Sequence, residues 1–178
     1  MEQIMEYEFT LKFKVEPEKT SEDDIHVRLG EAGCTDALVG LGLPGYVGLE
    51  FIREAGSAEE AILRALADVK KALPGATLVE AGPDFVGLTD VADLLGMSRQ
   101  NMRKLFISHA ASFPPPVHGG ASMVWHLAQV LEFLKTRAYE FTPSVLEVAT
   151  ASMQVNIAKE RTLVDARLDE RLRRQLAA

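Results

Sequence analysis

Apolar and polar side chains alternate along residues 5–15, which is the period expected of a β-strand with one buried face. The polar face carries charged and hydroxyl side chains, and the apolar face carries Tyr7, Phe9, Leu11, Phe13 and Val15. Residues 36–41 and 46–52 predict two more strands, because the Gly-Leu-Pro-Gly sequence between them is typical of a tight turn. Residues 77–79 predict a fourth, short strand.

Two helices are predicted between these strands. The first follows Ser21, a residue type that caps helices, and ends at Gly33. The second follows Ser57, which forms a capping-box sequence with Glu60, and its apolar residues recur at helical spacing up to Pro74. The order βαββαβ predicts an α+β domain of the ferredoxin-like type over residues 1–82, with both helices on one face of an antiparallel sheet.

Residues 88–106 have the pattern of a helix-turn-helix. Thr89 is placed to cap a first helix, and Gly96 permits a tight turn with a positive φ angle. Met97 is expected to fill the space between the helices, and Ser98 is placed to cap the second helix. Each position in this segment therefore has a mechanical role in a pair of closely packed helices.

The second helix of this pair has one apolar and one polar face. Met102, Leu105 and Phe106 are expected to point inward. Arg, Gln and Asn side chains pair with base edges, and Lys and Arg bind phosphates, so the outward face is suited to DNA. A helical hairpin with a solvated polar face would show the same pattern. The outward residues are Arg99, Gln100, Asn101, Arg103 and Lys104.

A short wing is predicted after this helix pair. It consists of a stiff Phe-Pro-Pro-Pro-Val segment from Phe113, a turn at Gly119 and Gly120, and a return strand, after which a closing helix follows. Together with the Leu-Gly-Met-Ser-Arg-Gln sequence that contains Ser98, these features resemble the excisionase-like and MerR-like winged helix-turn-helix proteins. The resemblance covers residues 85–137.

The resemblance implies that this segment binds double-stranded DNA. The helix from Ser98 would lie in the major groove, and the wing, with His118, Gly119 and Gly120, would contact the backbone or the minor groove. The wing departs from the pattern of these families. Arg or Lys is common there, whereas this chain has His118, Ser122, Met123, Val124 and His126. Wing contacts are therefore expected to be weak and to strengthen below about pH 6.5, where histidine gains charge.

Charge is distributed unevenly along the chain, whose formal net charge is -7. Residues 1–84 carry 8 Lys or Arg against 17 Asp or Glu, a net charge of -9, whereas residues 85–137 carry 5 against 3, a net charge of +2. DNA binding depends on local potential more than on the total charge. The acidic first domain is therefore expected to be a sensor for a small molecule or an interaction module for a protein.

Residues 142–176 predict one long amphipathic helix with imperfect heptads and no internal Gly or Pro beyond its first turn. An isolated helix of this length needs its apolar stripe covered, either by the body of the protein or by a second chain. We expect a homodimer through this helix, because dimerisation would double the number of phosphates contacted. The apolar positions are Leu146, Ala149, Met153, Ile157, Val164, Leu168 and Leu172.

No motif points to catalysis, and we expect no enzyme activity, no cofactor and no metal. Residues 40–45 match Gly-x-Gly-x-x-Gly, but a strand follows them where a dinucleotide site needs a helix. His118 and His126 have no third ligand nearby, and Cys34, the single cysteine, is expected in the core or a loop. The acidic N-terminal sequence and the lack of a bilayer-length apolar run predict a cytoplasmic protein with no membrane association.

These features predict a sequence-specific transcriptional regulator that binds a palindromic or repeated site as a homodimer. The alternative is an antitoxin or adaptor whose acidic first domain binds a protein partner. A metabolic enzyme would need clustered polar residues on the open face of the first sheet, which the alternating pattern does not indicate.

Overall fold

A four-stranded antiparallel sheet forms the first half of the computed structural model, which describes residues 4–16 and 21–177. The burial of Tyr7, Phe9, Leu11 and Phe13 on a single face confirms the strand predicted from alternation. The rings of Phe9 and Phe51 stack at 5.0 Å between centroids across the directly paired strands. The strands are β1 (Met5–Lys14), β2 (Ala37–Gly40), β3 (Tyr46–Ala55) and β4 (Thr77–Gly82). Their order across the sheet is β2-β3-β1-β4.

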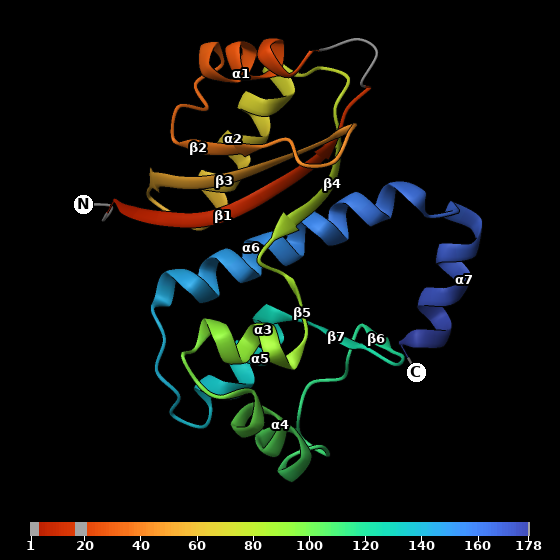
Figure 1. Ribbon diagram of the computed structural model, residues 1–178. Helices are drawn as coiled ribbons and strands as arrows, with labels where there is room; N and C mark the ends of the chain where they lie inside the picture. The colour runs from red at the N-terminus through yellow and green to blue at the C-terminus, as the bar shows by residue number, and fades with distance from the viewer. Residues whose placement is uncertain (1–3, 17–20, 178) are drawn as a thin grey trace.

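Helices α1 (Glu22–Glu31) and α2 (Ala58–Ala72) cover the apolar face of this sheet, and α2 lies behind the strands in Figure 1. Ser57 caps α2 as predicted, because its hydroxyl accepts the backbone N–H of Glu60 at 3.1 Å. The opposite face of the sheet is open over β1, β2 and β3, which leaves its polar side chains accessible. The chain is therefore of the α+β class, as predicted.

A buried arginine joins the sheet to helix α2 and to the loop before β2. Arg53 donates from Nε and Nη2 to the two carboxylate oxygens of Asp36 at 2.7 and 3.0 Å, and from Nη1 to Asp68 at 2.8 Å. These hydrogen bonds hold the pKa of Asp36 below its usual value. The pattern of the sequence does not indicate this cluster, because an arginine on the apolar face of a strand is unexpected.

Asp36→Asn is expected to lower the free energy of unfolding by about 1 to 2 kcal/mol at neutral pH, since a charge-assisted pair to a buried guanidinium is lost. Because the pKa of Asp36 is depressed in the folded state, its contribution is full above the unfolded pKa of about 4 and is lost as pH falls through the folded pKa. Urea titrations at several pH values check this. Glu132→Gln, at an exposed carboxylate, is the control. A difference from wild type that persists at the most acidic pH would contradict the assignment.

The second half of the chain contains a small three-stranded sheet and three short helices. Its core is aromatic, with Trp125 packed edge-on against Phe106 and Phe113 at ring distances of 5.4 and 5.8 Å. The sheet has the order β5-β7-β6. The elements are β5 (Phe85–Val86), α3 (Leu88–Leu94), α4 (Arg99–Ser108), β6 (His118–Gly119), β7 (Met123–His126) and α5 (Leu127–Lys135).

Helix α6 (Pro143–Glu160) joins the two halves and runs along the β1–β4 edge of the first sheet (Figure 1). Consecutive residues of α6 pack into different cores: Val148 is buried in the core of the first half and Ala149 in the core of the second half. Its Asn156 amide accepts from the N–H of Ala81 at 2.9 Å and donates to the carbonyl of Ala81 at 2.8 Å. The side chain of Asn156 thereby occupies the hydrogen-bonding edge of β4.

The polar contact of Asn156 extends into the segment between the two halves. Its Nδ2 also donates to Asp84 Oδ2 at 2.8 Å, and Asp84 Oδ1 lies 2.7 Å from His126 Nδ1. The Asp84 backbone carbonyl accepts the N–H of Leu127 at 2.7 Å. The side chains of Asp84 and Asn156 are both buried, so this network fixes the connecting segment, the end of β7 and α6 against one another.

The single helix expected over residues 142–176 is interrupted in the structure. After α6, a 3₁₀ turn over Arg161–Leu163 precedes a separate helix, α7 (Ala166–Leu176), which Asp165 caps through the N–H groups of Arg167 and Leu168. Helix α6 packs against both halves of the molecule, whereas α7 leaves the direction of α6 and runs toward the β6–β7 hairpin with its leucines exposed (Figure 1). Only the first half of the predicted helix is therefore covered in the described chain. None of the helices in residues 4–16 and 21–177 is long and apolar enough to cross a membrane.

Candidate nucleic-acid interface

The turn between α3 and α4 sets the direction of the exposed helix α4. Gly96 has a φ angle of 62°, which confirms the positive φ predicted for this position. The Ser98 hydroxyl accepts the N–H of Asn101 at 3.1 Å, so Ser98 caps α4 as predicted. The cap predicted for α3 at Thr89 is wrong. Helix α3 begins after Gly87, whose N–H donates to Asp90 at 2.7 Å, and Thr89 lies within the helix.

Helix α4 separates its side chains into the two faces predicted from their spacing. Met102 is fully buried, and Leu105 and Phe106 pack partly against the same core. The opposite surface is solvent-exposed and contains two arginines, one lysine and two amides. Its residues are Arg99, Gln100, Asn101, Arg103 and Lys104.

Helix α4 borders an open groove of about 580 Å³. Arg99, Gln100 and Arg103 line it from α4, while Ala121 and Met123 line it from the β6–β7 hairpin. Among the described residues, the other predicted site residues lie outside this groove. Ser98 uses its hydroxyl as the cap, and Asn101 and Lys104 are exposed elsewhere on α4.

This surface of α4 is positively charged, and its cations make few ion pairs. Arg99 Nη2 lies 3.7 Å from Asp93 Oδ2, and both side chains are largely exposed, so the pair is worth little and is easily exchanged for a phosphate. In the part of the chain that the structure describes, no ion pair involves Arg103 or Lys104. Three cations are therefore accessible on one helix.

The predicted wing corresponds to the hairpin of β6 and β7, in which His118 pairs with Val124 and Gly119 pairs with Met123. His118, Gly119 and Gly120 are all exposed. They lie at the end of the hairpin and outside the groove that α4 borders. The hairpin residues that line the groove, Ala121 and Met123, were not among the predicted site residues. Alternation along β7 places Met123 on the same face as Trp125, which also lines the groove, so this spacing could have indicated Met123.

The sequence also failed to reveal what His126 does. The sequence suggested a wing contact or a metal ligand for its ring, whereas the ring contacts the buried carboxylate of Asp84. The two residues are 42 positions apart, and no local pattern links them. Arg137 was missed as well. Its guanidinium lies 3.7 Å from the centroid of Phe133 and donates to the hydroxyl of Ser112 at 3.0 Å, which closes the edge of the aromatic core.

Acidic, histidine and cysteine side chains do not gather into a metal-binding group anywhere in residues 4–16 and 21–177. Cys34 is buried as a free thiol beside α1, and burial raises its pKa to about 11. It is therefore protonated at neutral pH and behaves as a small core side chain, as the sequence predicted.

No family model, no curated protein and no solved structure matches the chain.

Proposed function

We propose that the protein is a sequence-specific DNA-binding regulator of transcription. In this proposal α3 and α4 form a helix-turn-helix, β6 and β7 form its wing, and the first half is a ferredoxin-like unit that senses a ligand or a partner. Helix α4 inserts into the major groove from Ser98 onward. Arg99, Gln100 and Arg103 contact base edges, and Lys104 contacts phosphate.

The observation that carries the proposal is the exposed polar face of α4. Five side chains close together there can donate hydrogen bonds, and none of them supports the core. The packed core behind α4, with fully buried Met102 and Trp125 only slightly exposed, holds the helix in a fixed direction. A firmly held helix with accessible cations and amides is what direct readout of a base sequence requires.

Selection from a pool of random duplex DNA at two salt concentrations tests the proposal. The wild-type protein is expected to enrich one motif, with an affinity that falls as salt rises, because bound phosphates release counterions. Arg99→Ala and Arg103→Ala are each expected to weaken binding by about tenfold or more, which is the loss of one good base contact.

The matched control is Arg64→Ala, which removes an exposed arginine from α2 in the other half of the molecule. Its affinity for the selected motif is expected to stay within about twofold of wild type, since a distant surface charge acts only through a screened field. Equal binding of random and selected DNA by all four proteins would overturn the proposal.

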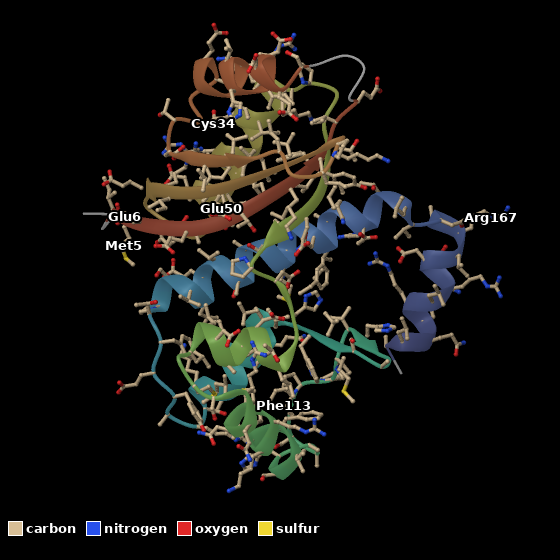
Figure 2. The ribbon with its side chains drawn as sticks, viewed as in Figure 1. Met5, Glu6, Cys34, Glu50, Phe113 and Arg167 are labelled. Atoms are coloured by element: carbon tan, nitrogen blue, oxygen red, sulfur yellow. The ribbon has the colours of Figure 1, made fainter. Side chains whose placement is uncertain are left out.

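The open face of the first sheet supports a second candidate, an antitoxin or adaptor that binds a basic protein segment. Glu6, Glu8 and Glu50 lie around a hollow of about 770 Å³, and Figure 2 labels Glu6 on β1 and Glu50 on β3. Leu38 and Ile52 line the same hollow and are 70% and 56% exposed. Carboxylates around exposed apolar side chains suit a segment that is both basic and apolar.

A lysine-rich amphipathic peptide tests this candidate. If the adaptor function is correct, the peptide binds the wild-type protein and loses about tenfold or more in affinity to Glu50→Lys, because like charges then face each other. The control is Glu132→Lys on α5, an exposed site in the other half of the molecule. Equal peptide binding by the two variants would remove the candidate.

We also propose that the protein acts as a homodimer through its C-terminal region. The support is that α7 leaves its leucines exposed and that a single α4 offers few cations for a stable complex with DNA. Two copies on a symmetric site would double these contacts.

A further inference from the structure

Helix α7 presents an apolar stripe to solvent. Leu168, Leu172 and Leu176 recur every four residues along one side and are 49%, 45% and 84% exposed. Val164, just before the helix, is also exposed. A short helix with a continuous leucine stripe is not stable when solvated on all sides, so this stripe is suited to contact with another surface.

A groove between α2 and α6 offers apolar walls elsewhere on the molecule. It has a volume of about 570 Å³, and its walls include Ile62, Leu63, Leu146, Ala151 and Val155. The charged residues that line it are both acidic, namely Glu59 at the start of α2 and Glu147 on α6.

The length of the stripe fits the groove. Helix α7 has 11 residues, which span roughly 16 Å at about 1.5 Å per residue. The groove follows α6 from Leu146 to Ala158, a distance of roughly 18 Å by the same rise. One helix of the length of α7 would therefore fill the groove from end to end.

The charges also match. Arg167 and Arg171 lie on the same side of the leucine stripe, and no ion pair in the described part of the chain involves either of them. Arg173 and Arg174 are different, because they pair with Asp169 and Glu170 on α7 itself. The groove has two glutamates, and two unpaired arginines lie beside the stripe. The two surfaces are therefore complementary in charge as well as in shape.

The position of α7 argues against contact with its own groove. It leaves the end of α6 and runs toward the β6–β7 hairpin, away from α2 (Figure 1), and Arg167 lies at the outer edge of the molecule (Figure 2). We propose that the α7 stripe of one copy docks in the α2–α6 groove of a second copy, and that the second copy returns the same contact. The inference rests on the proposed homodimer and names its two surfaces. A reciprocal contact of this kind is closed, so it stops at two chains.

Charge reversal on the full-length protein tests the proposal. Glu59→Arg and Arg171→Glu each place like charges together in both contacts of a homodimer. Each is expected to weaken dimerisation by about tenfold or more, measured by light scattering across a concentration series. Both sites are exposed, so folding should be unaffected, and circular dichroism melting curves check this. Lys70→Glu, at the far end of α2, is the control and should dimerise as wild type does.

Mixing the two variants gives the decisive result. In a mixed pair, the arginine introduced at position 59 of one copy faces the glutamate introduced at position 171 of the other. The second contact of that pair joins the unchanged Glu59 to the unchanged Arg171, so dimers are expected to reappear. A monomeric wild type, single variants that dimerise normally, or a mixture that stays monomeric would each overturn the proposal.

The DNA selection tests the regulator function, and the dimer measurement tests the docking contact. A normal dimer response with no DNA binding would defeat the regulator function alone. DNA binding by a dimer that is indifferent to both charge reversals would defeat the docking contact alone.

Discussion

Trp125→Ala is expected to destabilise the second half of the molecule by about 4 kcal/mol, because a large buried aromatic side chain leaves a cavity that the core cannot fill. Trp125 is only 2% exposed, packs edge-on against Phe106 and Phe113, and donates from Nε1 to the carbonyl of Pro114 at 3.0 Å. Phe106 belongs to α4. Loss of Trp125 should therefore loosen α4 and reduce affinity for the selected DNA as well as stability.

Urea denaturation followed by far-ultraviolet circular dichroism measures this effect, since the substitution removes the only tryptophan and with it the fluorescence signal. Trp125→Phe is the matched control. It keeps an aromatic ring and loses the hydrogen bond to Pro114, so about 1 to 2 kcal/mol is expected. An alanine variant as stable as the phenylalanine variant would show that Trp125 does not organise this core.

Asn156→Leu is expected to cost about 3 to 5 kcal/mol although the two side chains are similar in size. The leucine leaves the N–H and carbonyl of Ala81 and the carboxylate of Asp84 without the partner that Asn156 supplies, and Asp84 and Asn156 are buried. Because these groups fix α6 against both halves, the loss should also separate the unfolding of the two halves. A single cooperative transition would then become two.

Denaturation followed with two probes measures this separation: tryptophan fluorescence reports on the second half, which holds Trp125, and circular dichroism reports on the whole chain. The control is Gln129→Leu on α5, where an exposed amide is replaced and the change is expected to stay within about 0.5 kcal/mol. Coincident transitions in Asn156→Leu, at the midpoint of the wild type, would show that the network is energetically neutral.

Local patterns in the sequence predicted most elements of the fold but not the contacts that join them. Alternation identified β1, and Ser57 and Ser98 identified the starts of α2 and α4, because a strand face and a helix cap are determined by residues near one another. The break between α6 and α7 was missed because apolar residues recur at helical spacing on both sides of it, which predicts one helix. The local signal for the break is Asp165, which caps α7.

In the candidate site, too, local spacing predicted some features, and contacts between distant residues were missed. The outward direction of Arg99 and Arg103 follows from helical spacing relative to Met102. The contribution of Met123 to the groove and the contact of Asp84 with His126 depend on residues brought together from distant positions. The Arg53 cluster is similar, because Asp36 and Asp68 reach it from a loop and a helix.

The shared helix α6 also affects the order in which the chain can fold during synthesis. Domains usually fold from the N-terminal end as they leave the ribosome. Here Val148 of α6 belongs to the first core and Ala149 of α6 to the second. Both cores therefore stay partly uncovered until α6 has been synthesised. The nascent chain is therefore expected to hold two incomplete cores at once, and both close in a single late step.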